Sequence, residues 1–381
     1  AVKLLKKSET EGPIIEILEE LVAEDNEAFP SALPVRREVD HRAWITLQIG
    51  CDNTCTYCIV PSVRGPEISR PFGQLLDEAR SFAEQGVTEV TLLGQNVNSY
   101  GRDLTKKLKA QNPSKEDAFQ VGSLWLEASS RKIKPLFADL LKTVGSIEGI
   151  ERVRFISPHP KDLTLEIVEA MSETENVCEH LHLPLQSGSD SILSAMHRGY
   201  TSERFLKKVQ QARSGIEDLS VTTDLIVGFP GESEKDFEET LAVVAEAQFD
   251  AAYTYIFSPR PGTNAAEMES KFVEHGIAVR RYETLRDVVK RSSLLKHKER
   301  VGRIEEVLVE GRSKKGTDLI KTRTRQNKIL HLKSQDSLRV GTYARVEVTD
   351  APSHYLFGEL LEIVAAPKHR KRIPVMAEQS G

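Results

Sequence analysis

Three of the four cysteines of this 381-residue chain lie within eight residues, at Cys51, Cys55 and Cys58. Thiolates this close together can bind one metal centre, whereas they are poorly spaced for a strain-free disulfide framework. Structural zinc sites usually combine two ligand pairs, and here only Cys178 could complete such a site. Three thiolates on a 4Fe–4S cluster would instead leave one iron without a protein ligand and open to a small molecule. The spacing therefore favours a three-cysteine cluster, with a structural zinc site as the alternative.

The elements that must position these cysteines alternate between short apolar segments and amphipathic ones, which predicts βα units and a parallel sheet. Strands are expected at 44–49, 87–93, 152–156, 180–185, 220–227 and 251–257. Helices are expected at 72–85, 135–146, 162–172, 189–197, 202–214, 234–247 and 276–297. Right-handed crossovers would curl six such units into a partial (βα)6 barrel of the TIM type, with its chemistry at the carboxyl ends of the strands. The first cysteine follows the first strand by one glycine, so the cysteine loop is expected at that face.

Four of the other predicted strands run into segments rich in glycine, amide and hydroxyl groups, at 94–98, 157–160, 184–189 and 228–232. Each segment alone could simply form a turn. Glycines, however, let a backbone approach a ligand closely, and amides and hydroxyls can hydrogen-bond a ribose or an amino-acid group. Four such segments on one predicted face, beside the cysteine loop, predict a ligand site.

The cysteine segment 50–65, followed by Ser69-Arg70-Pro71, resembles the radical S-adenosylmethionine (SAM) methylthiotransferases. Residues 92–100 are similar to the MiaB branch of that family, which modifies transfer RNA. The resemblance covers residues 28–365 and includes the segments 155–160, 183–188, 196–200 and 226–232. Relatives that modify a ribosomal protein usually carry other residues at 95–98, so the resemblance favours RNA as the substrate.

The resemblance implies that Cys51, Cys55 and Cys58 hold a 4Fe–4S cluster whose open iron binds SAM. Reductive cleavage of SAM would give a 5′-deoxyadenosyl radical that takes hydrogen from C2 of an isopentenylated adenosine next to the anticodon. A second SAM would supply the methyl of the methylthio group. One alternative is a methylthiotransferase that acts on a ribosomal protein or another substrate. Another, of a different class, is a non-catalytic RNA-binding protein with a structural zinc site.

Position along the predicted strand ends suggests which residues contact SAM. The candidates are Gln95, Gln186, Ser187 and Glu232. The guanidinium of Arg198 could bind the methionine carboxylate or a phosphate, or it could form a salt bridge on a helix surface. The family also implies an electron donor such as a flavodoxin or ferredoxin.

Family members carry three further cysteines in an N-terminal domain, where they bind an auxiliary 4Fe–4S cluster. No cysteine precedes Cys51 here, and the chain opens on Ala-Val-Lys. We interpret residues 1–43 as a linker and the remnant of that domain, and Cys178 as a small buried apolar residue. We expect the chain as given to cleave SAM without completing methylthiolation.

The predicted radical SAM core, 44–299, is interrupted by a stretch at 102–134 with eight Lys/Arg against four Asp/Glu. A loop this long within a compact domain is either functional or disordered. We expect this insertion to contact the tRNA backbone. The alternative is that it is disordered and has no such role.

The C-terminal part, 300–365, is predicted to form a small β-barrel of the TRAM type, with strands at 304–309, 319–322, 329–332, 343–348 and 357–363. The net charge of the chain is −5, yet residues 296–333 carry twelve Lys/Arg against five Asp/Glu. A basic stretch alone could be a solvated surface, but beside the cysteine motif it predicts contacts to the phosphates of a tRNA anticodon stem-loop. The expected contacts are Lys314, Lys315, Lys321, Arg323, Arg325 and Lys328. Residues 366–381 are expected to be a disordered basic tail.

The composition predicts no membrane association, because no run of eighteen apolar residues occurs. Few cysteines, grouped as metal ligands, predict a reducing compartment. We expect a cytoplasmic monomer, with an organellar location (mitochondrion or plastid) as the alternative.

Overall fold

The structure is a computed structural model that describes residues 40–110, 119–121, 124–126, 135–314, 316, 318–333 and 338–367. The segments 107–110, 119–121 and 124–126 are described by their backbone alone. The predictions for residues 1–39, for much of the insertion 102–134, for Lys315 and for the tail from 368 lie outside the described residues.

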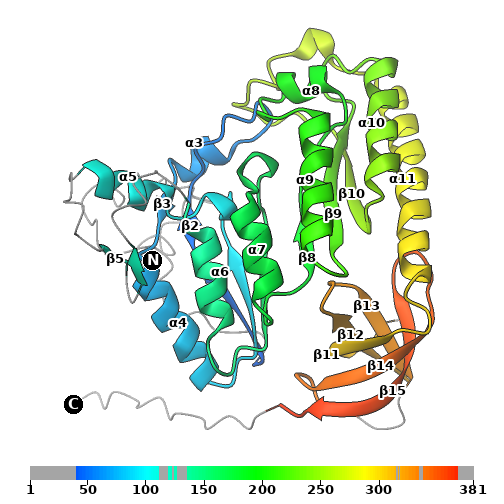
Figure 1. Ribbon diagram of the computed structural model, residues 1–381. Helices are drawn as coiled ribbons and strands as arrows, with labels where there is room; N and C mark the ends of the chain where they lie inside the picture. The colour runs from blue at the N-terminus through cyan, green and yellow to red at the C-terminus, as the bar shows by residue number, and fades with distance from the viewer. Residues whose placement is uncertain are drawn as a thin grey trace, which may run out of the picture. The chain divides into compact units, whose positions relative to one another are not determined.

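Six parallel strands form the core, in two three-stranded sheets (Figure 1). The first contains β1 (Arg42–Thr46), β4 (Glu89–Leu93) and β7 (Arg152–Phe155). The second contains β8 (His180–His182), β9 (Ser220–Val227) and β10 (Ala251–Ile256). A single parallel bridge, Val153 to Val177, joins β7 to the segment before β8. The predicted partial (βα)6 barrel is therefore confirmed, with β1 and β10 as its two outer strands.

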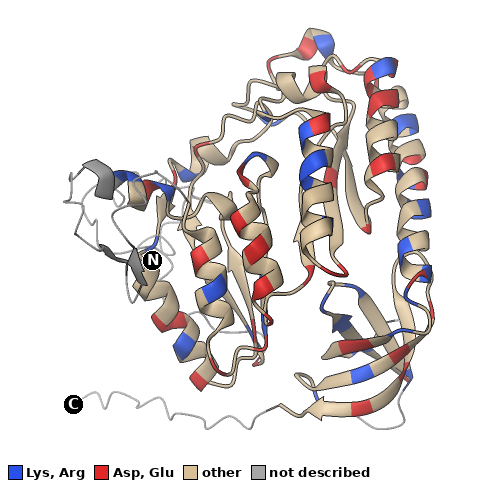
Figure 2. Cartoon of the chain, in the orientation of Figure 1, with Lys and Arg blue, Asp and Glu red and all other residues tan. Residues whose placement is uncertain are grey.

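Helices follow the strands and cover one face of each sheet, because alternate strand residues are apolar. They are α4 (Phe72–Glu84), α6 (Phe137–Gly145), α7 (Leu165–Glu173), α8 (Asp190–Ala195), α9 (Ser202–Gly215), α10 (Glu234–Ala247) and α11 (His275–Lys298). On β1, for example, Ala43 and Ile45 belong to the same buried apolar cluster as Leu75 of α4. Figure 2 shows charged residues along the helices of both sheets, α4, α6 and α7 as well as α9, α10 and α11, while the core strands carry few.

The predicted first strand, 44–49, is divided in the structure. β1 ends at Thr46, and β2 (Gln48–Ile49) pairs antiparallel with β3 (Ile68–Ser69). The change of partner occurs at Leu47, whose N–H donates to the Leu93 carbonyl of β4 (2.8 Å) and whose carbonyl accepts from the Arg70 N–H just after β3 (2.9 Å). Gly50 then turns the chain after β2: it has φ +75°, and a Cβ there would come within 1.9 Å of the Pro66 oxygen. The β2–β3 pair ties together the two ends of the cysteine loop.

Four short elements lie at the carboxyl ends of the strands or in the adjoining loops. They are α3 (Val60–Arg64) and the 3-10 turns η1 (Val97–Ser99), η2 (Pro160–Asp162) and η3 (Glu269–Lys271). Within the predicted insertion, the described backbone forms α5 (Arg102–Ala110) and an antiparallel pair of β5 (Phe119–Val121) and β6 (Leu124–Leu126).

The C-terminal strands close into a five-stranded barrel in the order β11-β12-β13-β15-β14. Their bounds are β11 (Ile304–Arg312), β12 (Leu319–Thr324), β13 (Ile329–Lys333), β14 (Tyr343–Asp350) and β15 (Leu356–Ala365). Inward apolar residues such as Val307, Leu330 and Val346 form its separate buried core. The predicted small barrel is confirmed. Among the described residues, no helix has the length and apolar character needed to span a membrane.

Candidate active site

The three neighbouring cysteines lie on the loop between β2 and α3, and all three are free and partly exposed. Thr56, in the middle of this loop, is held from two sides. Its backbone N–H donates to the Met196 carbonyl (3.2 Å), and its own carbonyl accepts from the Ala265 N–H (2.9 Å). The Thr56 hydroxyl also donates to the Ala195 carbonyl at the end of α8 (2.9 Å). The loop backbone is therefore fixed while its thiols remain accessible.

Cys178 lies away from this loop. It is 2% exposed, its N–H donates to the Val153 carbonyl of β7 (3.0 Å), and burial raises the pKa of its thiol. Cys178 precedes β8 at the amino-terminal end of the strands, whereas the three neighbouring cysteines follow β2 at the other end, so Cys178 does not complete a metal site with them. The prediction that Cys178 is a small buried residue is confirmed.

Arg198 lies against the cysteine loop. Its Nη1 donates to the Cys55 sulfur (3.3 Å), its Nε to the Tyr200 hydroxyl (3.0 Å) and its Nη2 to the Pro184 carbonyl (3.2 Å). Arg198 is only 5% exposed, so the alternative of a salt bridge on a helix surface is wrong. Burial opposes its charge, but Tyr200, Tyr57 and Cys55 outweigh burial and raise the pKa of Arg198.

The donor set of this loop fits an iron–sulfur cluster. Clusters of the 4Fe–4S type are held by cysteine thiolates, and positive charge and hydrogen bonds near the sulfurs tune them. Cys51, Cys55 and Cys58 supply three thiols on one anchored loop, and Arg198 supplies a buried cation that donates to one of the sulfurs.

Gln95 follows β4 directly. Its side-chain oxygen is buried and has no hydrogen-bond partner in the part of the chain that the structure describes. A buried acceptor without a partner costs about 1–3 kcal/mol. This cost would disappear if a ligand donated a hydrogen bond to Gln95, so it remains a candidate SAM contact.

Gln186 and Ser187 follow β8 and are buried. Gln186 has φ +71°, and its backbone bonds to β9 on both sides, through Asp224 and Ile226 (2.8 Å each). The Ser187 hydroxyl lies 3.2 Å from the Thr240 hydroxyl of α10. The Ser187 hydroxyl therefore contacts the helix layer, whereas Gln186 is fixed by its backbone.

Glu232 holds its own loop in place. Its Oε2 accepts from the Gly228 N–H (2.7 Å) and from Nη1 of Arg281 on α11 (2.8 Å), and both charged residues are 5% exposed or less. Burial raises the pKa of Glu232, and the hydrogen bond from Gly228 and the charge of Arg281 act against that rise. Its Oε1 is buried without a partner among the described residues, so one oxygen remains for a ligand.

His159 is a buried residue of this face that sequence reasoning did not single out. Its Nδ1 accepts from the Lys161 N–H (3.2 Å), and its backbone exchanges two hydrogen bonds with the Asn98 side chain. Burial, followed by the charge of Arg198, lowers its pKa to about 2, so the imidazole is neutral. The only signal in the sequence was its place in the segment 157–160 after a predicted strand.

Ion pairs engage four of the basic barrel residues that were expected to contact phosphate. Lys328 forms a buried ion pair with Asp250 of the core (2.6 Å), and Arg325 pairs with Glu179 of the core (2.7 Å). Lys321 and Arg323 both pair with Glu310 within the barrel (2.7 and 2.6 Å). Burial against Asp250 argues against phosphate contact by Lys328. Lys321, Arg323 and Arg325 are partly exposed, and Glu310 is shared by Lys321, Arg323 and Arg42, so phosphate contact by these three residues stays a prediction. Lys314 is exposed.

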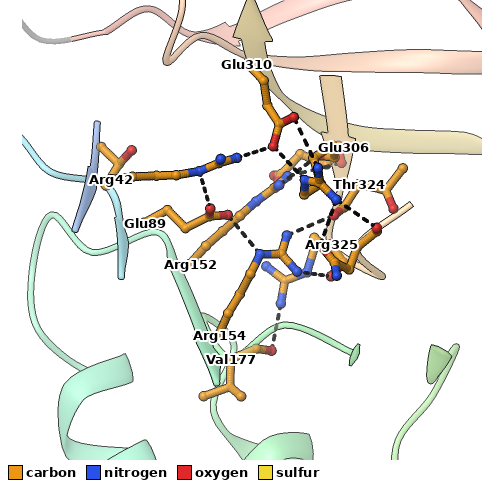
Figure 3. Close-up of polar contacts among 12 residues, drawn as sticks. Arg42, Glu89, Arg152, Arg154, Val177, Glu306, Glu310, Thr324 and Arg325 are labelled. Atoms are coloured by element: carbon orange, nitrogen blue, oxygen red, sulfur yellow. Dashed lines mark hydrogen bonds and ion pairs between the residues drawn. The ribbon is translucent and has the colours of Figure 1, made fainter. Parts of the chain in front are cut away.

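The barrel docks on the amino-terminal ends of the core strands. Arg152 of β7, fully buried, donates to the Glu306 carboxylate (2.9 Å; Figure 3). It also donates to the Arg323 carbonyl (2.9 Å). Arg154 donates to the Thr324 carbonyl (2.9 Å) and, on its other side, to Glu89 (3.0 Å).

Glu89 also pairs with Arg42 of β1 (2.7 Å), which reaches Glu310 of the barrel (Figure 3). Burial opposes the charge of Glu89, but Arg154 and Arg42 outweigh it and lower the pKa of Glu89. The docking surface and the cysteine loop thus lie at opposite ends of the same strands.

Two family models match the chain. One, described as the radical SAM superfamily, matches residues 45–244, and one described as the TRAM domain matches residues 298–361. A tRNA-2-methylthio-N6-dimethylallyladenosine synthase from Thermoanaerobacter sp. is 43% identical over 343 residues, which cover 90% of this chain and 67% of that protein. The chain belongs to the radical SAM superfamily and, within it, to the family of these synthases. Membership implies a 4Fe–4S cluster and SAM as cofactors.

Synthase 1 of the same description from Mycobacterium marinum is 44% identical over 351 residues, which cover 91% of this chain. The chain spans 63% of the length of that relative. Among solved structures, coproporphyrinogen III oxidase from Escherichia coli, described as a radical SAM enzyme, has a TM-score of 0.42 and 13% identity. That match covers 80% of this chain and 66% of the oxidase.

Proposed function

We propose that this chain carries the SAM-cleaving core and the RNA-binding barrel of a tRNA methylthiotransferase. Its substrate would be N6-(dimethylallyl)adenosine next to the anticodon, and the methylthio group would be added at C2. The observation that carries the proposal is the anchored loop of three free thiols at the carboxyl ends of the parallel strands, beside the buried Arg198. The relatives named above and the C-terminal barrel support RNA as the substrate.

An aromatic C–H has no acidic proton that a side chain could remove, so the hard chemistry belongs to the cofactor. When bound, the reduced cluster and SAM supply a radical that can take this hydrogen. The role of the chain's own residues is to bind and orient the cluster and SAM. Cys51, Cys55 and Cys58 would hold the cluster, and the Arg198 guanidinium stabilises negative charge at the Cys55 sulfur. Gln95 and the free oxygen of Glu232 are the best-placed acceptors for polar groups of SAM.

The test begins with iron, sulfide and zinc per chain after anaerobic reconstitution. About four irons and four sulfides would support one three-cysteine cluster. About eight of each would still support the cluster and would add a second one. Zinc at about one per chain without iron would overturn the proposal.

The activity arm measures SAM cleavage with a chemical reductant and, by mass spectrometry of digested tRNA, methylthioadenosine. Cys55→Ala should abolish cleavage. Cys178→Ala should retain it, because Cys178 lies away from the cysteine loop. Equal activity of both variants would contradict the assignment of the cysteine loop.

A further inference from the structure

The inward-facing residues of the two outer core strands include exposed aromatics. In a strand, alternate side chains point to opposite faces. On β10, Ala252 and Ile256 pack against the buried core, whereas Tyr253 and Tyr255 are 60% and 53% exposed. On β1, the neighbours of Trp44 are buried in the core and Trp44 is 70% exposed. The three rings therefore lie on the face of the strands that is turned away from the helices.

Strand order puts these rings on both sides of the open edge of the partial barrel. β1 pairs with β4 and β10 pairs with β9, and among the described residues neither has a strand on its other side. Trp44 thus lies on one outer strand and the two tyrosines on the other. A ligand that enters through this open edge would meet aromatic side chains from both outer strands.

A hydrogen-bonding group lies beside the tyrosines. Asp224 of β9 is the register partner of Tyr253, and its Oδ2 is 3.2 Å from Nε2 of His182. The His182 ring contacts the Tyr253 ring edge-on, with centroids 6.0 Å apart. The Nδ1 of His182 is 3.0 Å from the Thr222 hydroxyl, so the imidazole is held on both sides. The surface therefore offers aromatic faces together with a positioned carboxylate.

A row of rings leads from the cysteine loop to the end of β10. Tyr57, between Cys55 and Cys58, contacts Phe229 (centroids 6.5 Å apart), and Phe229 contacts Phe257 (5.4 Å). Phe257 continues the alternating positions of Tyr253 and Tyr255 just after β10. Successive inward residues of a strand are about 6.6 Å apart, so Tyr253 lies about 13 Å along the strand from Phe257. A flat ligand on the tyrosines would lie below the cysteine loop on the same face.

We propose that Trp44, Tyr253 and Tyr255, with the Asp224 carboxylate, hold the unstacked adenine base of the RNA substrate. Enzymes that modify a base take it out of the stack, and single-stranded bases are bound by stacking on aromatic side chains. The base would enter between β1 and β10 and stack on these rings. Asp224 would accept the N–H that remains on N6 of an alkylated adenosine. This inference rests on the proposed function.

The test uses Trp44 as its own reporter. The chain has two tryptophans, so Trp125→Phe leaves Trp44 as the only one. The reconstituted protein is titrated with an anticodon stem-loop RNA that carries N6-(dimethylallyl)adenosine at the target position, and with the same RNA made abasic there. We expect Trp44 emission to change with the first RNA only. In the Trp125→Phe background, Tyr253→Ala should weaken binding of the first RNA about five- to a hundredfold and leave the abasic RNA unaffected.

Two controls keep the result interpretable. Tyr253→Phe keeps the ring and should bind like the parent, and so should Leu295→Ala, on an exposed position of α11. Asp224→Asn should lose part of the preference for the base without loss of fold. If the intact and abasic RNAs bind equally and give the same Trp44 signal, the inference is overturned while the proposed function stands. If neither RNA binds, both are overturned.

Discussion

Arg198 is buried against the sulfur of Cys55, and a buried cation is stable only when its donors find acceptors or opposite charge. The acceptors here are Pro184, Tyr200 and the sulfur itself. A cation at this position would stabilise the reduced state of a bound cluster, which is more negative than the oxidised state.

Replacement of Arg198 by Met should therefore make the midpoint potential of the cluster more negative, by an amount on the order of tens of millivolts. Arg198→Lys, which keeps the charge, should recover much of the shift. The potential is read by redox titration with electron paramagnetic resonance. An unchanged potential in Arg198→Met with a normal iron content would show that the guanidinium has only a packing role.

At the scale of single elements, Gly50 decides how the cysteine loop leaves the sheet. Its φ of +75° is unfavourable for residues with a Cβ, and a Cβ at this position would come within 1.9 Å of the Pro66 oxygen. Gly65, at the other end of the loop, has φ +70° but open space around it. Substitution of Gly65 would therefore introduce backbone strain alone, whereas substitution of Gly50 would introduce backbone strain together with a steric clash.

Gly65→Ala should cost about 1–3 kcal/mol, because the Gly65 backbone (φ +70°, ψ −165°) lies in a region that essentially only glycine adopts. Gly50→Ala should cost clearly more and should prevent the loop from taking up iron, because the backbone of Gly50 or Pro66 must move. Urea unfolding of the apoprotein and iron content after reconstitution measure the two effects. Equal losses in the two variants would contradict the role of the Pro66 contact.

The elements themselves were largely predictable, because their apolar residues repeat at strand and helix periods. The strand at 220–227 agrees with the structure to the residue, and those at 152–156 and 251–257 agree to within one residue. The division of 44–49 was not predictable, since it depends on pairing of Gln48 and Ile49 with Ile68 and Ser69, about twenty residues further along the chain. Of the candidate site, the cysteine loop was predictable from the spacing of its three cysteines. It missed Trp44, Tyr253 and Tyr255, because an exposed aromatic in a strand has the same local pattern as a buried one.

At the scale of the whole described structure, a buried charge network joins the barrel to the core, and Glu89 is its centre. It is 2% exposed and pairs with both Arg42 and Arg154. Loss of one partner from a buried network leaves uncompensated charge and costs about 3–5 kcal/mol. Glu89→Gln should therefore lower the free energy of unfolding by about that amount.

The matched control is Glu362→Gln. Glu362 pairs with Arg345 on the barrel surface, where both side chains are more than half exposed. Pairs of this kind contribute about 0–1 kcal/mol. Urea denaturation followed by both tryptophan fluorescence and circular dichroism gives the two values. If Glu89→Gln were no more destabilising than Glu362→Gln, the network would not hold the barrel to the core.

The basic residues of the barrel differ in how accessible they are to RNA. Lys314 lies on an exposed turn between β11 and β12, whereas Lys328 is buried against Asp250. Each phosphate contact contributes about one unit to the slope of log affinity against log salt concentration. Lys314→Gln should therefore weaken tRNA binding and reduce that slope by about one.

Lys328→Gln should leave the slope unchanged and instead lower stability by about 3–5 kcal/mol, because Asp250 loses its buried partner. Binding measured between about 50 and 200 mM salt, at a temperature where both variants are folded, distinguishes the two lysines. A reduced slope in Lys328→Gln would mean that the Lys328–Asp250 pair opens when RNA binds. The barrel would then have to shift on the core, since this ion pair joins the two.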